Sequence, residues 1–259
     1  GPILCVMEAD NLECAIELAN GTSYGLTSGI ETLSKEEINI WKNRVIAGNL
    51  YANRSTTGAI VQRQPFGGVK ASSFGFGMKA GGPNYVRQFI NFKSNKIPNS
   101  EMKNSFKTIY QNHFNKEVDY SKVRGQHNIF KYLKAKKTII IVDEKTKKED
   151  LEIVLISCET INVPFAIYSI GDSCHISDKK NKINALENLI EDFEEGTIIR
   201  SLIKFLPEIF MRECHRKNIH IYNRAPNTNG RIELLNYFTE QSLSINFHRY
   251  GNLMGETNI

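Results

Sequence analysis

Residues 138–142 read Thr-Ile-Ile-Ile-Val, an unbroken run of β-branched and aliphatic side chains. Such a run is typical of a parallel strand that is buried on both faces of its sheet. A helical pattern follows over residues 148–160, and a second apolar run follows at 165–170. Strand, helix and strand in this order predict a parallel β-α-β unit, so the second half of the chain is expected to be an α/β domain.

The alternation continues to the C-terminus. The expected elements are a helix over 184–193, a strand over 197–199, a helix from Pro207 to 217, a strand over 219–222, a helix near 232–238 and an extended piece over 242–247. This regularity predicts a Rossmann-like, doubly wound domain over residues 127–259. The extended piece places Leu243, Ile245 and Phe247 on one face, as in a strand that completes the edge of another sheet. A local edge strand within its own domain is the alternative.

The first 92 residues show the same alternation. The expected elements are a strand over 3–8, a helix capped by Asp10 with Glu13, a strand over 26–30, a helix capped by Ser34 with Glu37 and a strand over 49–53. Residues 54–84, here called the glycine-rich loop, interrupt this pattern with seven glycines and two prolines. A loop that long inside a compact domain is usually functional or disordered. A strand over 85–92 and a polar linker over 93–126 are expected next.

Composition places the chain among ordinary soluble proteins. Its 259 residues, 41% hydrophobic and 24% charged, predict one or two globular domains and exclude a disordered chain or a coiled coil. No apolar run approaches the ~20 residues that cross a bilayer, so no transmembrane segment is expected. The net charge of +5 is spread thinly, so nucleic acid is not expected as a partner. Five cysteines without C-x-x-C spacing indicate a reducing compartment, and we expect the cytoplasm.

Two motifs in the glycine-rich loop carry a family resemblance. Residues 56–68 read TTGAIVQRQPFGG, and residues 79–85 read KAGGPNY. Together they resemble the C-terminal part of the aldehyde dehydrogenase superfamily. More narrowly, they are similar to the L-glutamate γ-semialdehyde (1-pyrroline-5-carboxylate) dehydrogenase module of the proline utilization A family. The opening Gly1-Pro2-Ile3-Leu4 also fits the end of the superfamily's E-x-F-G-P signature, with an expression scar as the alternative for Gly1 and Pro2.

The resemblance implies oxidation of an aldehyde to a carboxylate through a cysteine thiohemiacetal, with NAD as the hydride acceptor. It also implies that residues 54–84 anchor the substrate: Thr57, Gly58 and Ala59 would hold its α-carboxylate, and Phe66 would pack on its aliphatic part. A glycine allows close approach of the backbone, and N–H groups make charge-assisted hydrogen bonds to a carboxylate. Alternatively, Phe66 is a core aromatic beneath a glycine turn.

The family's nucleophilic cysteine segment, its general-base glutamate segment and its cofactor-binding β-α-β region find no match in the chain. Residues 1–92 are therefore expected to be the C-terminal part of a longer catalytic domain, without catalytic or cofactor-binding residues and inactive alone. The parent would be a bacterial enzyme that uses NAD, and FAD as well if a proline dehydrogenase half is present. No metal site is expected, because the six histidines and five cysteines lack zinc-site spacing. Expected partners are the rest of the polypeptide, L-glutamate γ-semialdehyde and further copies of the chain.

The second half carries a weaker resemblance. Residues 126–130 (QHNIF) and 248–252 (HRYGN) are similar to the extra, noncatalytic C-terminal domain of longer proline utilization A proteins. This implies a lid or assembly domain over 127–259, with a terminal docking strand over 242–252. A small-ligand site in a Rossmann-like crevice is the alternative. The turn after residue 142 disfavours it, because Asp143 and Glu144 replace a glycine-rich turn and would repel a pyrophosphate.

Overall fold

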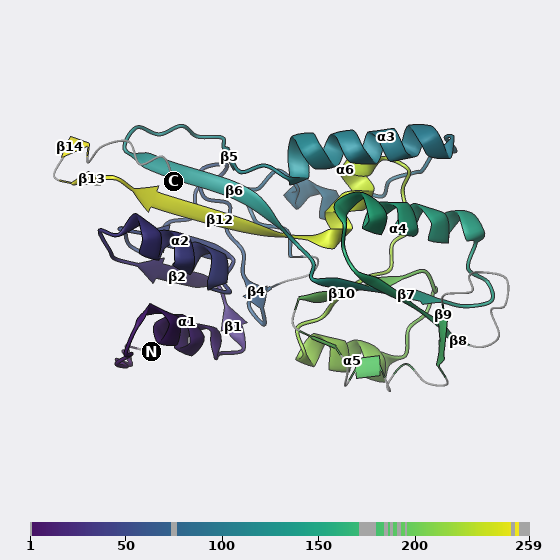
Figure 1. Cartoon of the computed structure of the whole chain (residues 1–259), viewed down its shortest axis with the longest axis horizontal. Helices are drawn as coiled ribbons and strands as arrows, with labels where there is room; N and C mark the ends of the chain where they lie inside the picture. The colour runs from purple at the N-terminus through teal and green to yellow at the C-terminus, as the bar shows by residue number, and fades with distance from the viewer. Residues whose placement is uncertain are drawn as a thin grey trace. The chain divides into compact units, whose positions relative to one another are not determined.

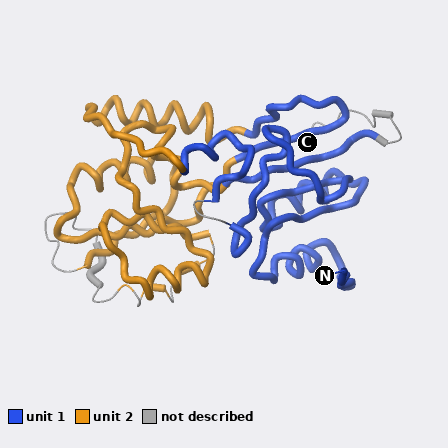
Figure 2. The backbone as a smooth tube through the Cα atoms, turned by 180° about the vertical axis from the view of Figure 1, so that it is seen from behind, with its two compact units in different colours: residues 1–88, 117–131, 240–259 blue, residues 89–116, 132–239 orange. Residues whose placement is uncertain are grey.

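The computed structural model describes residues 2–73, 77–170, 180–183, 186, 189–190, 193–194, 196–249 and 252–253. The chain folds into two compact units (Figure 2). Unit 1 comprises residues 1–88, 117–131 and 240–259, and unit 2 comprises residues 89–116 and 132–239. The chain passes between the units more than once, so neither unit is one continuous stretch of sequence.

Unit 1 is built around a mixed sheet of five strands, in the order β2-β3-β12-β6-β5 (Figure 1). Strands β2, β3 and β12 run parallel. The elements are α1 (Leu12–Asn20), β1 (Tyr24–Gly25), β2 (Thr27–Ile30), α2 (Lys35–Arg44), β3 (Asn49–Ala52), β4 (Val69–Lys70), the 3₁₀ helix η1 (Tyr85–Phe89), β5 (Val118–Asp119), β6 (Gln126–Lys134), β12 (Phe238–Asn246), β13 (His248–Arg249) and β14 (Asn252–Leu253). Strands β6 and β12 each continue into unit 2 at one end.

Local chemistry explains the first two helices. The Ser34 hydroxyl accepts from the Glu37 N–H (3.2 Å) and begins α2 as expected. Helix α1 is capped by Asn11, which accepts from Cys14 N–H (2.9 Å), so the prediction of Asp10 as the cap was wrong by one residue. The predicted strand over 3–8 is not formed, and Ile3 is 91% exposed. A lone extended segment is not stable as a strand, and no described residue pairs with this one.

Unit 2 contains a parallel sheet in the order β11-β10-β7-β8-β9, the order of a doubly wound α/β sheet. The predicted α/β fold class is confirmed. The elements are α3 (Asn99–Ile109), the π-helical turn η2 (Tyr110–Phe114), β7 (Lys137–Val142), α4 (Lys148–Ile161), β8 (Phe165–Ile170), β9 (Lys180–Ile183), β10 (Thr197–Ser201), α5 (Glu208–Arg216), β11 (His220–Tyr222), α6 (Gly230–Glu233) and the 3₁₀ helix η4 (Leu234–Tyr237).

The run that predicted this sheet is its central strand. Alternate residues of a strand face opposite sides, so β7 supplies apolar side chains to both faces. Ile139 and Ile141 pack in one core with Phe210 and Cys214 of α5. Helix α4 lies on the face opposite α5 (Figure 1).

The domain boundaries differ from the expectation in three places. The polar stretch 93–126 is not a linker, because α3 lies in it and buries Met102 and Phe106. Residues 85–89 form a 3₁₀ helix instead of a strand. Residues 127–259 are not one domain, because 240–246 join the sheet of unit 1, where β12 lies between β3 and β6 and is not an edge strand. Most of the helix expected over 184–193 lies outside the described residues.

A fully buried ion pair crosses the interior of unit 2. Arg200 Nη2 lies 3.1 Å from Glu233 Oε1, and Arg200 Nη1 donates to the carbonyls of Tyr222 (3.1 Å) and Arg224 (2.6 Å). Glu233 also accepts from the Asn227 N–H (2.9 Å). A buried pair is tolerated when its remaining donors and acceptors are satisfied, as they are around Glu233.

Removal of one partner of this pair is expected to destabilise unit 2 strongly. Glu233→Ala should lower its free energy of unfolding by about 3–5 kcal/mol, since it leaves a buried guanidinium unpaired. The matched control is Glu208→Ala, which breaks the exposed ion pair between Glu208 and Arg212 on α5 and should change little. Urea unfolding curves of both variants measure the difference. Similar midpoints for the two variants would contradict the prediction.

His113 lies in an aromatic cluster of unit 2. Its Nε2 is 2.9 Å from the Tyr132 hydroxyl, and the Phe114 ring stands edge-on to it at 4.9 Å. Burial, with a smaller effect of the Arg231 charge, lowers the pKa of His113 from 6.5 to about 4. The folded protein therefore keeps this imidazole neutral at neutral pH.

This shift predicts a pH-dependent stability. Because the pKa of His113 is lower in the folded chain, the unfolded chain binds the proton first as pH falls. The free energy of unfolding should therefore decline between about pH 6.5 and pH 4, with no contribution from His113 above that range. Urea midpoints at pH 7 and pH 4.5 should differ more in the unmodified chain than in His113→Gln. An equal difference in both would overturn the assignment.

Candidate functional site

The two motifs of the glycine-rich loop pair with each other. Phe66 and Ala80 exchange two backbone hydrogen bonds, each 2.9 Å long, and the Gln62 N–H donates to the Gly81 carbonyl (3.0 Å). A tight turn brings Gln64 back to Ile60 through two further backbone bonds. The loop is therefore an ordered structure over its described residues, and backbone hydrogen bonds join its two motifs.

Gly58 occupies a conformation that favours glycine. Its φ is +109°, and a Cβ at this position would lie 3.4 Å from Gln64 Oε1 and 3.6 Å from Arg54 Nη2. Thr57, Gly58 and Ala59 are all exposed. No residue in the described part of the chain accepts a hydrogen bond from the N–H of Gly58 or of Ala59. Two consecutive N–H groups are thus presented at an accessible turn.

The predicted site residues all lie in the glycine-rich loop, but they differ in exposure and in hydrogen bonding. Thr57 Oγ1 lies 2.7 Å from Ser55 Oγ, so a local hydroxyl pair engages it. Phe66 is half-buried, with its backbone held by Ala80. Its ring is therefore neither a fully buried core residue nor a free surface side chain.

A polar network beneath Gly58 includes residues far away in the sequence. With its amide oriented to satisfy its neighbours, Gln64 donates to the Gly58 carbonyl and accepts from Arg54 Nη1 (2.5 Å). Arg54 Nη1 also donates to Ser244 Oγ (2.7 Å), and that hydroxyl donates to Asn128 Oδ1 (2.7 Å). Gln64, Asn128 and Ser244 are buried, so each polar group requires these partners.

One face of β12 forms most of these contacts. Residues at i, i+2 and i+4 of a strand share a face, and Glu240, Ser242 and Ser244 have this spacing. The Ser242 hydroxyl donates to the Pro65 carbonyl (2.6 Å). Leu243 and Ile245 have the opposite parity and lie in the apolar core of unit 1. One strand therefore supports the loop with one face and fills the core with the other.

Glu240 holds the second motif. Its carboxylate accepts from the Lys79 backbone N–H (2.7 Å) and from Asn84 Nδ2 (2.6 Å). The Lys79 side chain is buried, and its ammonium donates to Asn49 Oδ1 (3.2 Å) and to the Gly67 carbonyl. Burial lowers the pKa of Lys79 to about 7, although the Glu240 charge opposes the shift.

Sequence reasoning missed these supporting residues. It predicted a terminal docking strand over 242–252 and assigned no role to Arg54, Gln64, Lys79 or Glu240. The sequence feature that could have indicated them is the polar character of residues 239–242 and 244 next to apolar positions. Polar side chains that become buried in a strand require specific hydrogen-bond partners.

The two buried cysteines among the described residues lack the features of an activated nucleophile. Burial raises the pKa of Cys158 to about 12 and that of Cys214 to about 12, opposite to the shift that activates a thiol. Cys5 is exposed in an irregular segment, and Cys14 lies in α1. Cys174 and the adjacent His175 lie outside the described residues.

The turn after β7 does not suit a dinucleotide. Asp143 closes it by accepting from the Lys145 N–H (3.0 Å) and the Thr146 hydroxyl (2.9 Å). Helix α4 then begins with Glu149 and Asp150 in its first turn. Negative charge at a helix N-terminus opposes binding of a pyrophosphate, so these residues do not fit NAD.

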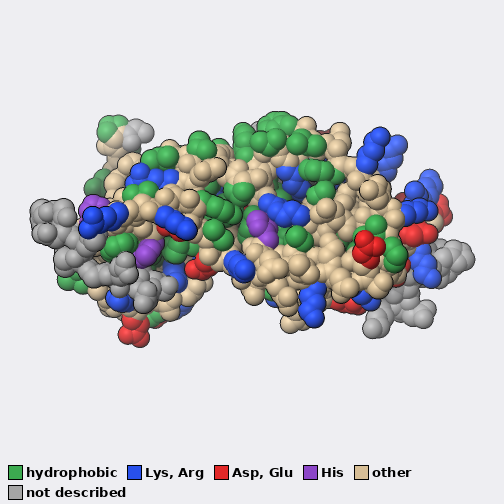
Figure 3. All heavy atoms as spheres, turned by 90° about the horizontal axis from the view of Figure 1, so that it is seen from above, with side chains coloured by type: hydrophobic (Ala, Val, Ile, Leu, Met, Phe, Trp, Pro, Cys, Tyr) green, Lys and Arg blue, Asp and Glu red, His purple; other side chains and the backbone are tan. Residues whose placement is uncertain are grey.

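The described residues contain no cluster of metal-ligating side chains. None of their helices is long and apolar enough to cross a membrane. On the face in Figure 3, Lys and Arg side chains are scattered among apolar and polar surface. The absence of a nucleic-acid partner stays a prediction.

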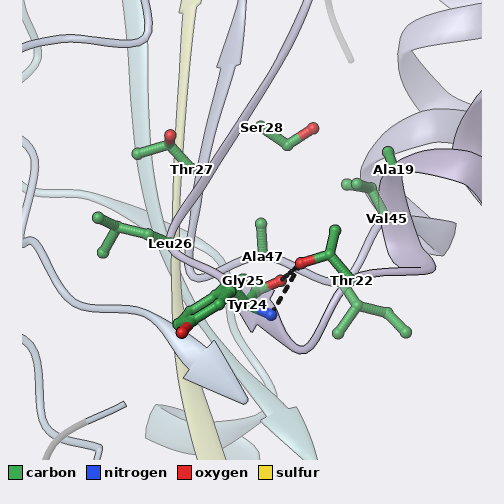
Figure 4. Close-up of a pocket in the computed structure, with 10 residues that line it drawn as sticks. Ala19, Thr22, Tyr24, Gly25, Leu26, Thr27, Ser28, Val45 and Ala47 are labelled. Atoms are coloured by element: carbon green, nitrogen blue, oxygen red, sulfur yellow. Dashed lines mark hydrogen bonds between the residues drawn. The ribbon is translucent and has the colours of Figure 1, made fainter. Parts of the chain in front are cut away.

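Unit 1 also has a hollow of about 260 Å³, whose lining includes no residue of the glycine-rich loop. It is lined mainly by small and apolar side chains of α1, β2 and the residues beside them (Figure 4). The Thr22 hydroxyl points back to the Tyr24 N–H (2.9 Å), so it is already engaged. Tyr24 is the one ionisable residue of the described lining, and it gives no convergent set of reactive groups.

Loss of Glu240 is expected to loosen the second motif. In Glu240→Ala, the Lys79 and Asn84 donors lose their acceptor, so the backbone around Lys79 should open more often. Amide hydrogen exchange at Lys79 and Ala80 should become at least tenfold faster. The control is Glu117→Ala, which removes a half-exposed carboxylate from the same unit. Unchanged exchange in Glu240→Ala, or equal acceleration in both variants, would contradict the role of Glu240.

The glycine-rich loop lies within a region that is similar to known proteins. A model of the aldehyde dehydrogenase family matches residues 1–95. The 1-pyrroline-5-carboxylate dehydrogenase of Oceanobacillus iheyensis is 42% identical over 93 residues, and that of Bacillus pumilus is 44% identical over 94 residues. Each match covers 36% of this chain and 18% of the relative.

The similarity to a solved structure extends further. The structure of proline utilization A from Corynebacterium freiburgense matches with a TM-score of 0.73 and 30% sequence identity. It covers 98% of this chain, and this chain covers 26% of it. The chain therefore spans about a quarter or less of the proteins it matches. Residues 1–95 are thus similar to the aldehyde dehydrogenase family, and the chain is similar to 1-pyrroline-5-carboxylate dehydrogenases and to proline utilization A.

Proposed function

We propose that this chain is the C-terminal part of an L-glutamate γ-semialdehyde dehydrogenase of proline catabolism. Its role in that enzyme is to anchor the substrate's α-carboxylate. The observation that carries the proposal is the exposed turn at Thr57, Gly58 and Ala59, where two consecutive N–H groups have no acceptor among the described residues. The similarity to 1-pyrroline-5-carboxylate dehydrogenases supports the choice of substrate.

The chemistry of the turn suits a carboxylate. Hydrogen bonds from backbone N–H groups to an ionised acceptor are shorter and stronger than neutral ones. Gly58 presents no side chain on the approach to its own N–H. Phe66 is half-buried and lies in the same loop. Its ring would pack on the substrate's methylene groups and help to exclude water.

The oxidation itself would use groups outside these residues. NAD would accept the hydride when bound, and the preceding part of the polypeptide would hold NAD and supply the nucleophilic cysteine and the general base. FAD would be present if the parent also has a proline dehydrogenase half. Within this chain, the residues bind and orient the substrate, and the chain alone is expected to be inactive.

Unit 2 would serve as a noncatalytic lid or assembly domain. Its parallel sheet has the strand order of a nucleotide-binding domain, but the acidic turn at 143–150 disfavours a pyrophosphate. We further propose a bacterial, cytoplasmic enzyme that self-associates. Exposed apolar side chains in unit 1, such as Ile3, Leu4 and Val86, support contacts with other segments or copies.

The proposal predicts that the complete polypeptide has dehydrogenase activity and that the 259-residue chain alone has none. The complete polypeptide should reduce NAD with L-glutamate γ-semialdehyde, whereas the purified 259-residue chain should show no turnover above buffer. Within the complete polypeptide, Gly58→Ala should raise KM for the semialdehyde about tenfold, because a side chain strains a backbone at φ +109°. The control is Gly21→Ala, at the end of α1 with an ordinary φ of −68°.

Either of two outcomes would overturn the proposal. Turnover by the chain alone that a single cysteine substitution abolishes would show that the nucleophile lies within it. No turnover of the semialdehyde by the complete polypeptide would show that the substrate is wrong.

A further inference from the structure

Among the described residues, two guanidinium groups of the glycine-rich loop, those of Arg54 and Arg63, lack a countercharge. Arg54 donates to Ser244 Oγ and to the Gln64 amide oxygen, and Arg63 donates to the Gln126 amide oxygen. All of these acceptors are neutral. Among the described residues, no carboxylate forms an ion pair with either arginine. Both Nε–H groups are also buried without an acceptor in that part of the chain.

The Asp119 carboxylate is connected to this network through Asn128, but neutral donors occupy it. Asp119 accepts from the N–H groups of Ser121, Lys122 and Asn128 and from the Ser121 hydroxyl, each at 2.9 Å. It is therefore held by neutral donors and not by either guanidinium. No carboxylate in the described part of unit 1 compensates the positive charge of Arg54 and Arg63.

Arg54 is the closer of the two to the proposed substrate turn. The Cβ direction of Gly58 meets Arg54 Nη2 at 3.6 Å, so the guanidinium lies directly beside the Gly58 backbone. Ser244 and Gln64 hold its Nη1, and its Cζ lies 5.5 Å from the centre of the Tyr51 ring. Three neighbours thus fix the position of the charge. A charge so placed, partly shielded from water, acts over several ångströms.

We propose that Arg54 is a specificity-determining residue, whose uncompensated charge selects aldehydes that carry an anion at the end remote from the aldehyde. This inference rests on the proposed function and adds a residue to it. The N–H groups of Gly58 and Ala59 supply direct hydrogen bonds, and Arg54 supplies the electrostatic potential at the same place. A neutral aldehyde gains nothing from that potential, so Arg54 contributes to discrimination and not to the chemical step.

The test compares two aldehydes in the complete polypeptide. L-glutamate γ-semialdehyde carries the anion, and pentanal is a neutral aldehyde with the same number of carbons. Arg54→Gln should raise KM for the semialdehyde about tenfold, with kcat unchanged and with no change in KM for pentanal. Arg54→Lys keeps the charge and should stay within about threefold of the unmodified enzyme. Arg44→Gln removes an arginine outside the network and should behave like the unmodified enzyme.

Two further readouts separate charge from structure. KM for the semialdehyde should rise with NaCl in the unmodified enzyme and rise less in Arg54→Gln. Inhibition by the product L-glutamate should weaken by the same factor as KM rises. Equal losses for both aldehydes, or no rescue by lysine, would show that Arg54 is only structural and would overturn the inference.

The unmodified enzyme distinguishes this failure from failure of the proposed function. If it oxidises the semialdehyde and Arg54→Gln keeps the same preference over pentanal, the Arg54 inference fails alone. If the unmodified enzyme does not oxidise the semialdehyde, both fail.

Discussion

The parallel pairing of Ser242–Ile245 with Asn49–Ala52 is the constraint on which unit 1 depends. It inserts a strand from the end of the chain between two others, so the sheet closes only after most of the chain has been made. Successive side chains of that strand point to opposite faces of the sheet, so its two faces have different roles. Leu243 and Ile245 complete the apolar core, whereas the opposite face carries the polar groups that hold the glycine-rich loop.

The supporting groups explain how a glycine-rich loop stays ordered. Seven glycines increase the backbone entropy that folding must overcome. Glu240 and Ser244 offset this by accepting hydrogen bonds from the loop: Glu240 from Lys79 and Asn84 in the second motif, and Ser244 from Arg54 just before the first. Because Gly58 needs no side-chain space of its own, the turn can remain exposed while the residues beneath it are buried. A carboxylate anchor requires both properties: ordered residues that support the turn, and a turn that the ligand can reach.

Unit 2 achieves stability by other means. Its central strand is apolar on both faces, and the deeply buried pair of Arg200 with Glu233 has its further hydrogen-bonding groups satisfied. Burial raises the pKa values of Cys158 and Cys214, and the turn after β7 is acidic. These features favour a scaffold over a reactive centre, which is consistent with the role proposed for it.

The sequence by itself determined many of the local elements and the resemblance to a family that residues 1–95 match. The β-branched run at 138–142 and the cap at Ser34 act over a few residues, so their outcomes could be read directly. The motif around Gly58 identified the loop. Only the tertiary structure decided that α3 is packed and not a linker, that β12 belongs to unit 1, and that Arg54 meets Ser244 across 190 positions. The physical reason is that strand pairing and buried polar contacts depend on partners distant in sequence, and no local pattern specifies which partner a buried group will find.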